Sequence, residues 1–189
     1  MRKIILQMSI SLDGHIEAPG RRIDWHRVDE ELHRHLNEEL RGAGAFLSGR
    51  VTYELMAAYW PTADAGPDCP PVMADFAAIW RRMPKVVYSR TIDHADWNTT
   101  IRREVDPDEV RALQAEPGGD LVVGGADLAA AFLAHDLVDE YRLYVHPVAI
   151  GGGKPLFPAD GVERPVRLLG TRTFGNGVVR LHYGRPDAA

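Results

Sequence analysis

Short apolar runs alternate along the chain with segments in which apolar residues recur at helical spacing. Residues 3–11 form the first run and predict a buried strand that ends at the turn signal Asp13–Gly14. Apolar residues then recur every four positions between Val28 and Leu40, which predicts an amphipathic helix over 28–41. The same reasoning predicts strands at 43–48, 85–88, 97–101, 121–123 and 140–146, and helices at 52–59, 72–83, 107–115 and 126–135.

Strands that alternate with helices predict an α/β fold, with a mixed, mostly parallel sheet that is flanked by helices. The segments 166–174 and 178–183 surround Gly175–Asn176–Gly177, so we expect a C-terminal antiparallel hairpin at one edge. The glycine run 151–153 predicts a flexible segment, either a substrate-side loop or a bend toward a neighbouring subunit. No repeat or linker divides the chain, so we expect a single domain over 1–185 and a tail over 186–189.

The composition excludes several classes of function. The formal net charge is -5 and no block of basic residues occurs, which argues against nucleic acid as a partner. Cys69 is the only cysteine and the histidines lack metal-ligand spacing, so we expect neither a disulfide nor a metal. No apolar stretch approaches the roughly 18–20 residues that span a bilayer, so we expect no membrane partner and a cytoplasmic location.

Three strand ends carry residues suited to an anion. Ligands bind beyond the carboxyl ends of such strands, where helix amino termini present unpaired N–H groups. The first strand end has a glycine, a guanidinium and a hydroxyl, the second a glycine pair, and the third two hydroxyls around a guanidinium: Gly49, Arg50 and Thr52; Gly124, Gly125 and Ala126; Ser89, Arg90 and Thr91. Each pattern alone also fits ordinary turn chemistry. Their occurrence at one end of the predicted sheet favours a dinucleotide with an extra phosphate.

Five motifs in a fixed order carry a resemblance: SISLDG at 9–14, GRVTYE at 49–54, YSRT at 88–91, GGA at 124–126 and PVAIGGGKPLF at 147–157. Over residues 2–183 the chain resembles the reductase family that contains dihydrofolate reductase and the C-terminal domain of the riboflavin-pathway deaminase-reductase. The resemblance implies a dihydrofolate-reductase-like fold, NADPH as hydride donor and a homodimer.

The resemblance also implies roles for individual residues. By motif, Gly49, Arg50 and Thr52 would hold the cofactor phosphates, and Ser89 and Arg90 the region of the 2′-phosphate. Gly124, Gly125 and Ala126 would take the pyrophosphate. Ser9 and Ile16 would border the nicotinamide.

Departures from the family pattern bear on the substrate. The chain has no H-x-E and P-C-x-x-C pair, so the zinc deaminase half is missing. Tyr53 and Glu54 follow Thr52 where the riboflavin reductases continue toward Asp-x-Pro, and no acid matches the one in the first helix of dihydrofolate reductase. The proton donor is therefore unassigned, and its candidates are Asp24, Asp29, Glu30 and Tyr144.

Each candidate has a second interpretation. The three carboxylates also fit a solvated face of the amphipathic helix, beside which Trp25 could form a stacking wall. Tyr144 and His146 point to the same side of their strand, where either could line a pocket or make a structural hydrogen bond.

The sequence leaves three functions open. The first is NADPH-dependent reduction of a small pterin-like or pyrimidine-like heterocycle. The second is the reduction of 5-amino-6-(5-phosphoribosylamino)uracil in riboflavin biosynthesis, for which only Lys154 and Arg142 could hold the ribose phosphate. The third is a non-catalytic, dimeric nucleotide-binding protein.

Overall fold

The computed structural model describes residues 1–186. They form two compact units, which we call the first and the second unit. The first unit comprises Met1–Arg2 and Val28–Val122, and the second comprises Lys3–Arg27 and the residues from 123 onward. The prediction of one domain over 1–185 stays a prediction, and residues 187–189 of the expected tail lie outside the described residues.

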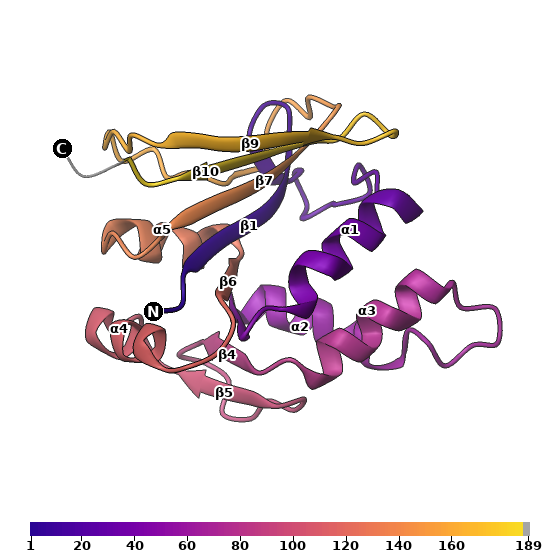
Figure 1. Cartoon of the computed structure of the whole chain (residues 1–189), viewed down its shortest axis with the longest axis horizontal. Helices are drawn as coiled ribbons and strands as arrows, with labels where there is room; N and C mark the ends of the chain where they lie inside the picture. The colour runs from indigo at the N-terminus through magenta and orange to yellow at the C-terminus, as the bar shows by residue number, and fades with distance from the viewer. Residues whose placement is uncertain (187–189) are drawn as a thin grey trace. The chain divides into compact units, whose positions relative to one another are not determined.

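Parallel strands and helices build the first unit (Figure 1). Its strands are β3 (Ala45–Gly49), β4 (Lys85–Tyr88) and β5 (Thr99–Arg102), and β4 pairs in parallel with both of the others. Its helices are α1 (Glu30–Arg41), α2 (Arg50–Tyr59), the short 3-10 helix η1 (Trp60–Thr62), α3 (Pro71–Arg82) and α4 (Pro107–Ala115).

Aromatic side chains fill the core of this unit. Trp80 is 2% exposed and packs with Tyr53, Phe76 and Ile79 against the strands. The Lys85 ammonium lies among them, 4.0 Å from the centre of the Trp80 ring. It donates to the carbonyl oxygens of Trp80, Met83 and Trp97 at 2.5, 2.8 and 2.9 Å, so all three of its protons have an acceptor. A buried charge is tolerated here because it is fully hydrogen-bonded.

Aspartate side chains set the starts of two helices. Asp106 accepts the backbone N–H groups of Asp108 and Glu109, which confirms the predicted cap before Pro107. Asp29 likewise accepts the N–H of Leu32 at 3.0 Å. Because Asp29 is the cap, α1 begins at Glu30 and not at the expected residue 28.

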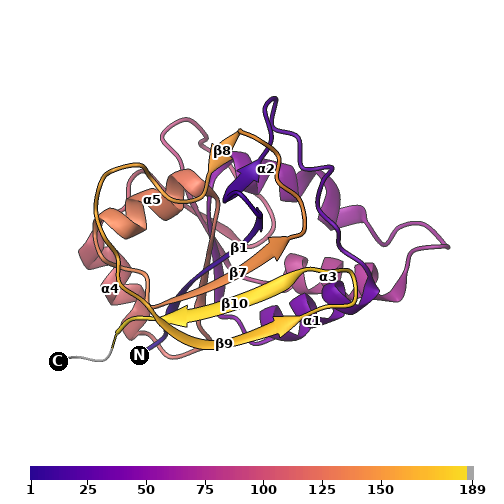
Figure 2. The same ribbon diagram turned by 90° about the horizontal axis from the view of Figure 1, so that it is seen from above.

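The second unit holds β1 (Ile4–Ser11), β7 (Glu140–His146), β10 (Val179–Gly184) and β9 (Arg167–Thr173) side by side in that order (Figure 2). β1 and β7 are parallel, whereas β10 runs antiparallel to both β7 and β9, which confirms the C-terminal hairpin. β6 (Leu121–Gly124), whose last two residues belong to this unit, leads into α5 (Ala126–Ala134). The fold is thus the predicted α/β type, with mostly parallel strands flanked by helices.

A short strand pair in this unit was not predicted. β2 (His15–Glu17) pairs antiparallel with β8 (Lys154–Pro155), which follows the glycine run 151–153. Gly153 has a φ of +128°, and a Cβ built on it would lie 2.0 Å from the Glu17 carbonyl oxygen. The run that we expected to be flexible therefore contains a close crossing of two backbones, which only glycine permits.

Candidate functional site

The carboxyl ends of β3 and β4 place two of the predicted phosphate motifs side by side. Gly49 and Tyr88 are register partners, so Arg50 and Ser89 leave neighbouring parallel strands at the same edge. Gly49 caps α2 without a side-chain hydrogen bond, and a Cβ added to it would meet nothing within 4 Å. The first turn of α2 therefore offers backbone N–H groups beside open space, an arrangement that suits an anion.

Arg50 and Thr52 lie on the first turn of α2. The guanidinium of Arg50 reaches the Glu54 carboxylate at 2.9 Å, and both side chains are exposed. Such an exposed pair between successive helical turns is weak, so a phosphate can compete for Arg50. Thr52 is half-buried, and no hydrogen bond of its hydroxyl occurs among residues 1–186.

The loop after β4 presents Arg90. Ser89 is buried, and its hydroxyl oxygen accepts the N–H groups of Thr91 and Ile92 at 3.2 and 3.3 Å, which folds the loop into a turn. Arg90 is exposed and has no ion pair or hydrogen bond within the described part of the chain. Ser89 thus shapes the loop, while the Arg90 guanidinium remains available to a ligand.

Arg103 braces this loop, and sequence reasoning missed it. Its guanidinium donates to the carbonyl oxygens of Ser89 and Ile92 at 3.2 and 2.7 Å and pairs with Asp93 at 2.7 Å. Arg103 follows β5, and the alignment of β5 with β4 brings it to the loop. No local signal distinguishes it from the adjacent Arg102.

The glycine pair of the second unit opens α5. Gly125 caps the helix in a left-handed conformation, with φ +94° and no side-chain hydrogen bond. Its N–H meets the Met8 sulfur at 3.1 Å, and a Cβ on Gly124 would approach only that sulfur, at 3.8 Å. A thioether is a weak acceptor, so an anion could replace it. Ala126, the first helical residue, is buried.

Ser9 and Ile16 lie on strands joined by the turn after β1. Ser9 is opposite Tyr144 of β7, and Ile16 is the middle residue of β2. The Asp13 carboxylate secures this turn by accepting the N–H groups of Ile150 and Gly151 at 3.1 and 2.8 Å. Hydrogen bonds from the Ser11 hydroxyl and from these N–H groups hold the pKa of Asp13 far below its usual value.

The candidate proton donors have different local roles. Asp24 is exposed and 4.0 Å from the Arg22 guanidinium. Asp29 caps α1, and Glu30 pairs with Arg34 one turn later. Both carboxylates thus have the local roles that are typical of a solvated helix face. Tyr144 is 1% exposed, with its ring 6.3 Å from that of Phe174.

Three rings gather at the carboxyl end of β7, and sequence reasoning missed their grouping. The His26 ring stacks on the His146 ring with centroids 5.1 Å apart, and the Trp25 edge meets both rings, at 4.2 and 5.5 Å. His146 is fully buried, and its Nδ1 accepts the N–H of Arg27 at 3.0 Å. Burial lowers the pKa of His146 to about 4 and also lowers that of His26. His146 therefore makes the structural hydrogen bond that was one of its two predicted roles.

The cations considered for a substrate phosphate both face carboxylates. Lys154 pairs with Asp127 in the first turn of α5 at 2.5 Å, and Arg142 lies 3.7 Å from Glu140. Glu140 also binds Lys3 and His182, at 2.5 and 2.8 Å. The buried Glu140 therefore occupies Arg142, whereas the exposed pair of Lys154 with Asp127 is weak, like that of Arg50 with Glu54.

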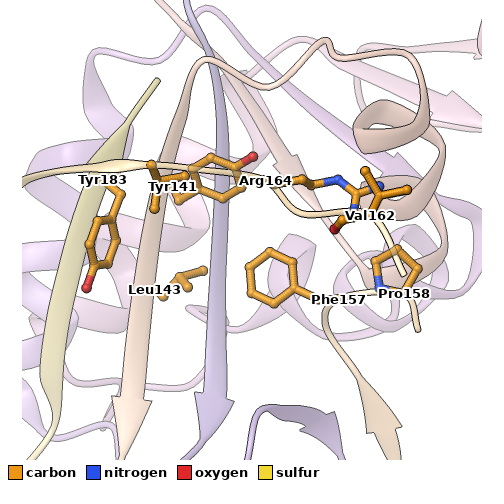
Figure 3. A pocket seen from close by; sticks show the side chains of 8 residues that line it. Tyr141, Leu143, Phe157, Pro158, Val162, Arg164 and Tyr183 are labelled. Atoms are coloured by element: carbon orange, nitrogen blue, oxygen red, sulfur yellow. The ribbon is translucent and has the colours of Figure 1, made fainter. Parts of the chain in front are cut away.

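An apolar pocket of about 360 Å³ opens near the start of β7 (Figure 3). Figure 3 shows side chains of β7 and β10 facing those of the segment after β8; the lining residues are Tyr141, Leu143, Phe157, Pro158, Val162, Arg164, Val166 and Tyr183. The Arg164 guanidinium is held by Asp160 at 2.6 Å. The pocket therefore offers mainly apolar surface.

Two further findings concern residues 1–186. No group of three or more His, Cys, Asp or Glu residues is arranged to hold a metal ion. None of the helices in this range is both long and apolar enough to cross a membrane.

The arrangement is that of an α/β protein whose strand ends carry residues suited to an anion, and comparisons with known proteins define its class. The family model of the RibD C-terminal domain matches residues 2–180. The uncharacterised protein YyaP of Bacillus subtilis strain 168 is 33% identical over 183 residues, which cover 96% of this chain and 94% of YyaP. The chain therefore belongs to the RibD C-terminal domain family, a family of reductases.

Solved structures agree on the fold. A protein from Shewanella sp. PV-4 named for riboflavin biosynthesis has a TM-score of 0.73 at 21% identity, over 98% of this chain and 99% of that one. A diaminohydroxyphosphoribosylaminopyrimidine deaminase/5-amino-6-(5-phosphoribosylamino)uracil reductase from Thermotoga maritima has a TM-score of 0.67 at 14% identity. That match covers 98% of this chain and 57% of the bifunctional protein.

Proposed function

We propose that the protein is an NADPH-dependent reductase that transfers a hydride to a small pyrimidine-like or pterin-like heterocycle. The observation that carries the proposal is the exposed Arg90 guanidinium, which lacks a partner within residues 1–186 and follows β4 beside the open start of α2. A guanidinium at a helix start and strand end is suited to a phosphate monoester, the group that distinguishes NADPH from NADH.

The residues present fit such a cofactor. Gly49, Arg50 and Thr52 would hold phosphate at the start of α2, and Ser89 and Arg90 would hold the 2′-phosphate. Gly124, Gly125 and Ala126 would hold the pyrophosphate at the start of α5, where the Met8 sulfur is the acceptor to be displaced. Ser9 and Ile16 would border the nicotinamide. When bound, the cofactor supplies the hydride, while these residues bind and orient it.

We propose a heterocycle without a ribose phosphate. Arg142 faces the buried Glu140, which leaves only Lys154, in an exposed pair with Asp127, where a sugar phosphate is best held by several charge-assisted donors. A neutral, flat ring needs only apolar surface and a few hydrogen bonds. The proton that accompanies the hydride would come from water or from one of the four candidate donors.

We further propose that the protein is cytoplasmic and forms a homodimer. The family resemblance implies the dimer, and an apolar surface around the pocket supports it. Phe157, Val162, Val166 and Leu168 are 41–59% exposed, and β9 pairs only with β10 among the described residues. An open edge strand beside exposed apolar residues favours pairing with another chain. Light scattering should give twice the chain mass, and Leu168→Glu should shift it toward the monomer.

The cofactor is tested by titrating intrinsic tryptophan fluorescence with NADPH and with NADH. We expect tighter binding of NADPH, and Arg90→Ala should weaken it about tenfold to a hundredfold, the worth of hydrogen bonds to a charged group. NADH binding should be unchanged. Arg111→Ala is the matched control, because the one ion pair of Arg111 within residues 1–186 is with Asp108 on α4. Equal affinity for the two cofactors in the unmodified protein would contradict the proposal.

Turnover is tested separately. Oxidation of NADPH across a panel of dihydropterins and aminopyrimidines would support a reductase. Cofactor binding without oxidation by any member of the panel would favour the non-catalytic, nucleotide-binding alternative.

A further inference from the structure

Residues 23–27, which we call the strap, are held by two hydrogen bonds of the Arg27 backbone, one to the end of β7 and one to the hairpin turn. The Arg27 N–H donates to His146 Nδ1 at 3.0 Å, and the Arg27 carbonyl accepts from Asn176 Nδ2 at 2.8 Å. Other bonds of the segment are local. The His26 N–H donates to the Ile23 carbonyl, and the Trp25 indole donates to the Arg22 carbonyl. The two bonds at Arg27 therefore fix the strap against β7 and the hairpin turn.

The bond from Arg27 determines the protonation state of His146. A ring nitrogen that accepts an N–H must carry a lone pair, so Nδ1 is unprotonated. The neutral ring then holds its proton on Nε2, which is buried and has no partner in the described residues. Protonation of Nδ1 would turn the acceptor into a second donor that faces the Arg27 N–H. The strap bond and a charged His146 are therefore incompatible.

The neighbours of His146 reinforce this exclusion. The charged or titratable groups on elements packed against it are His26 and Arg27 in the strap, Asp13 and His15 beyond β1, and Arg180 on β10. Asp13 is already engaged by backbone N–H groups, and the arginines stay charged. The His26 ring stacks directly on His146, so two protonated rings would stand 5.1 Å apart.

We propose that His146 is a positioning residue whose unprotonated Nδ1 latches the strap, and that protonation of His146 releases it. The latch holds Trp25 and His26 at the carboxyl end of β1 and β7, the end on which Ser9 lies. Burial and the charges of His26 and Arg27 lower the pKa of His146 to about 4, so the latch stays closed at neutral pH. Only the consequence for catalysis rests on the proposed function, because the latch itself needs neither cofactor nor substrate.

Amide hydrogen exchange of the full chain, measured by NMR without ligands, tests the latch. Between neutral pH and about pH 4, protection of the Arg27 amide should fall about tenfold relative to the Ala18 amide, as expected for the loss of one hydrogen bond. Ala18 belongs to the same loop, but its N–H donates to the Arg22 carbonyl at 2.9 Å and makes no bond to His146. Its exchange therefore corrects for general loosening of the segment.

Two variants separate the acceptor from the ring. His146→Asn offers a carbonyl oxygen that does not titrate, so Arg27 protection should become independent of pH. His146→Phe keeps a ring but has no acceptor, so at neutral pH the protection of its Arg27 amide should be as low as that of the unmodified protein in acid. Asn176→Ala removes the other strap bond and should weaken protection equally at both pH values.

The proposal is overturned if the Arg27 and Ala18 amides of the unmodified protein change in parallel, or if His146→Asn retains the acid effect. Should acid loosen the whole chain, His146→Phe at neutral pH decides, because unchanged Arg27 protection there would exclude the latch. For catalysis, the acid limb of kcat/KM should disappear in His146→Asn while the preference for NADPH, which depends on Arg90, remains. If the protein binds no NADPH but loses Arg27 protection in acid as described, the proposed function is wrong and the latch is still supported.

Discussion

The Asp13 carboxylate accepts the Gly151 N–H at 2.8 Å, which ties the turn after the first strand to a glycine run almost 140 residues further along the chain. The same carboxylate also takes the N–H of Ile150, and the Ser11 hydroxyl bonds to it. In the sequence Asp13 resembles an ordinary Asp–Gly turn residue, but in the structure it joins two segments that are distant in the chain. We call this pair of hydrogen bonds the brace. It positions β2 and β8, and with them Ile16.

Replacement of Asp13 should loosen this brace. Asp13→Asn keeps the size of the side chain but removes the charge that strengthens its hydrogen bonds, so we expect a lower melting temperature and faster exchange at the Gly151 amide. Because the pKa of Asp13 is lowered in the folded state, its contribution is present above the usual aspartate pKa and is lost as pH falls below it. Asp24→Asn, at an exposed carboxylate, is the control and should change little.

Histidine titration should produce a second, separate pH effect on stability. His146 has a folded-state pKa of about 4 and an unfolded pKa near the usual value of about 6.5, so the unfolded state binds more protons between them. The free energy of unfolding should therefore rise with pH across this window. Denaturant midpoints measured over the window should show a flatter profile in His146→Asn. An equally steep profile in that variant would assign the effect to other groups.

The buried ammonium of Lys85 should be costly to remove. Lys85→Met leaves the carbonyl oxygens of Trp80, Met83 and Trp97 without their donor, so we expect a loss of about 3 kcal/mol or more in the free energy of unfolding. Lys154→Met removes an exposed ion pair and should cost about 1 kcal/mol or less. Urea denaturation of both variants measures these losses. Similar losses of unfolding free energy in the two variants would contradict a stabilising role of the Lys85 hydrogen bonds.

Gly153 should tolerate no side chain. In Gly153→Ala the new Cβ would lie 2.0 Å from the Glu17 carbonyl oxygen, so β2 and β8 would have to separate. Gly161→Ala is a matched control, since Gly161 also has a positive φ but has nothing within 4 Å of an added Cβ. In the control, the strained backbone conformation should lower the free energy of unfolding by roughly 1–2 kcal/mol. Gly153→Ala should lower it clearly more. Thermal unfolding of both variants measures the difference.

Arg103→Ala should affect cofactor binding without contact to the cofactor. Arg103 holds the carbonyl oxygens of Ser89 and Ile92, so its loss should let the Arg90 loop fluctuate. We expect NADPH to bind several-fold more weakly, while NADH affinity stays the same. Fluorescence titration with both cofactors measures this, and an equal loss for both would indicate damage to the whole site.

Local sequence patterns predicted elements whose signals are local. The limits of β4 and β7 agree with the predicted segments 85–88 and 140–146, because β-branched and aromatic residues mark both strands and a proline adjoins each. The Asp106–Pro107 start of α4 is likewise encoded in adjacent residues. In contrast, β2 and β8 have three and two residues, too few for any periodicity.

The site was predictable only in part for a related reason. Gly49 and Arg90 belong to motifs whose chemistry is visible in consecutive residues, and the register of β3 with β4 brings these motifs to one edge. Arg103 acts through a pairing between strands, and His26 meets His146 across 120 positions. Such contacts arise from topology, which a single sequence does not display.

Because Lys85 is enclosed by the aromatic core of the first unit, its chemical reactivity reports on the unfolding of that core. The sequence has only three lysines: Lys85 as a whole residue is 3% exposed, whereas the side chains of Lys3 and Lys154 are 57% and 36% exposed. Amine-reactive acylating reagents should therefore label Lys3 and Lys154 readily in the native protein. Acylation at Lys85 would occur only in molecules whose aromatic core has come apart, so its rate, followed by mass spectrometry, would count unfolding events in a crude extract.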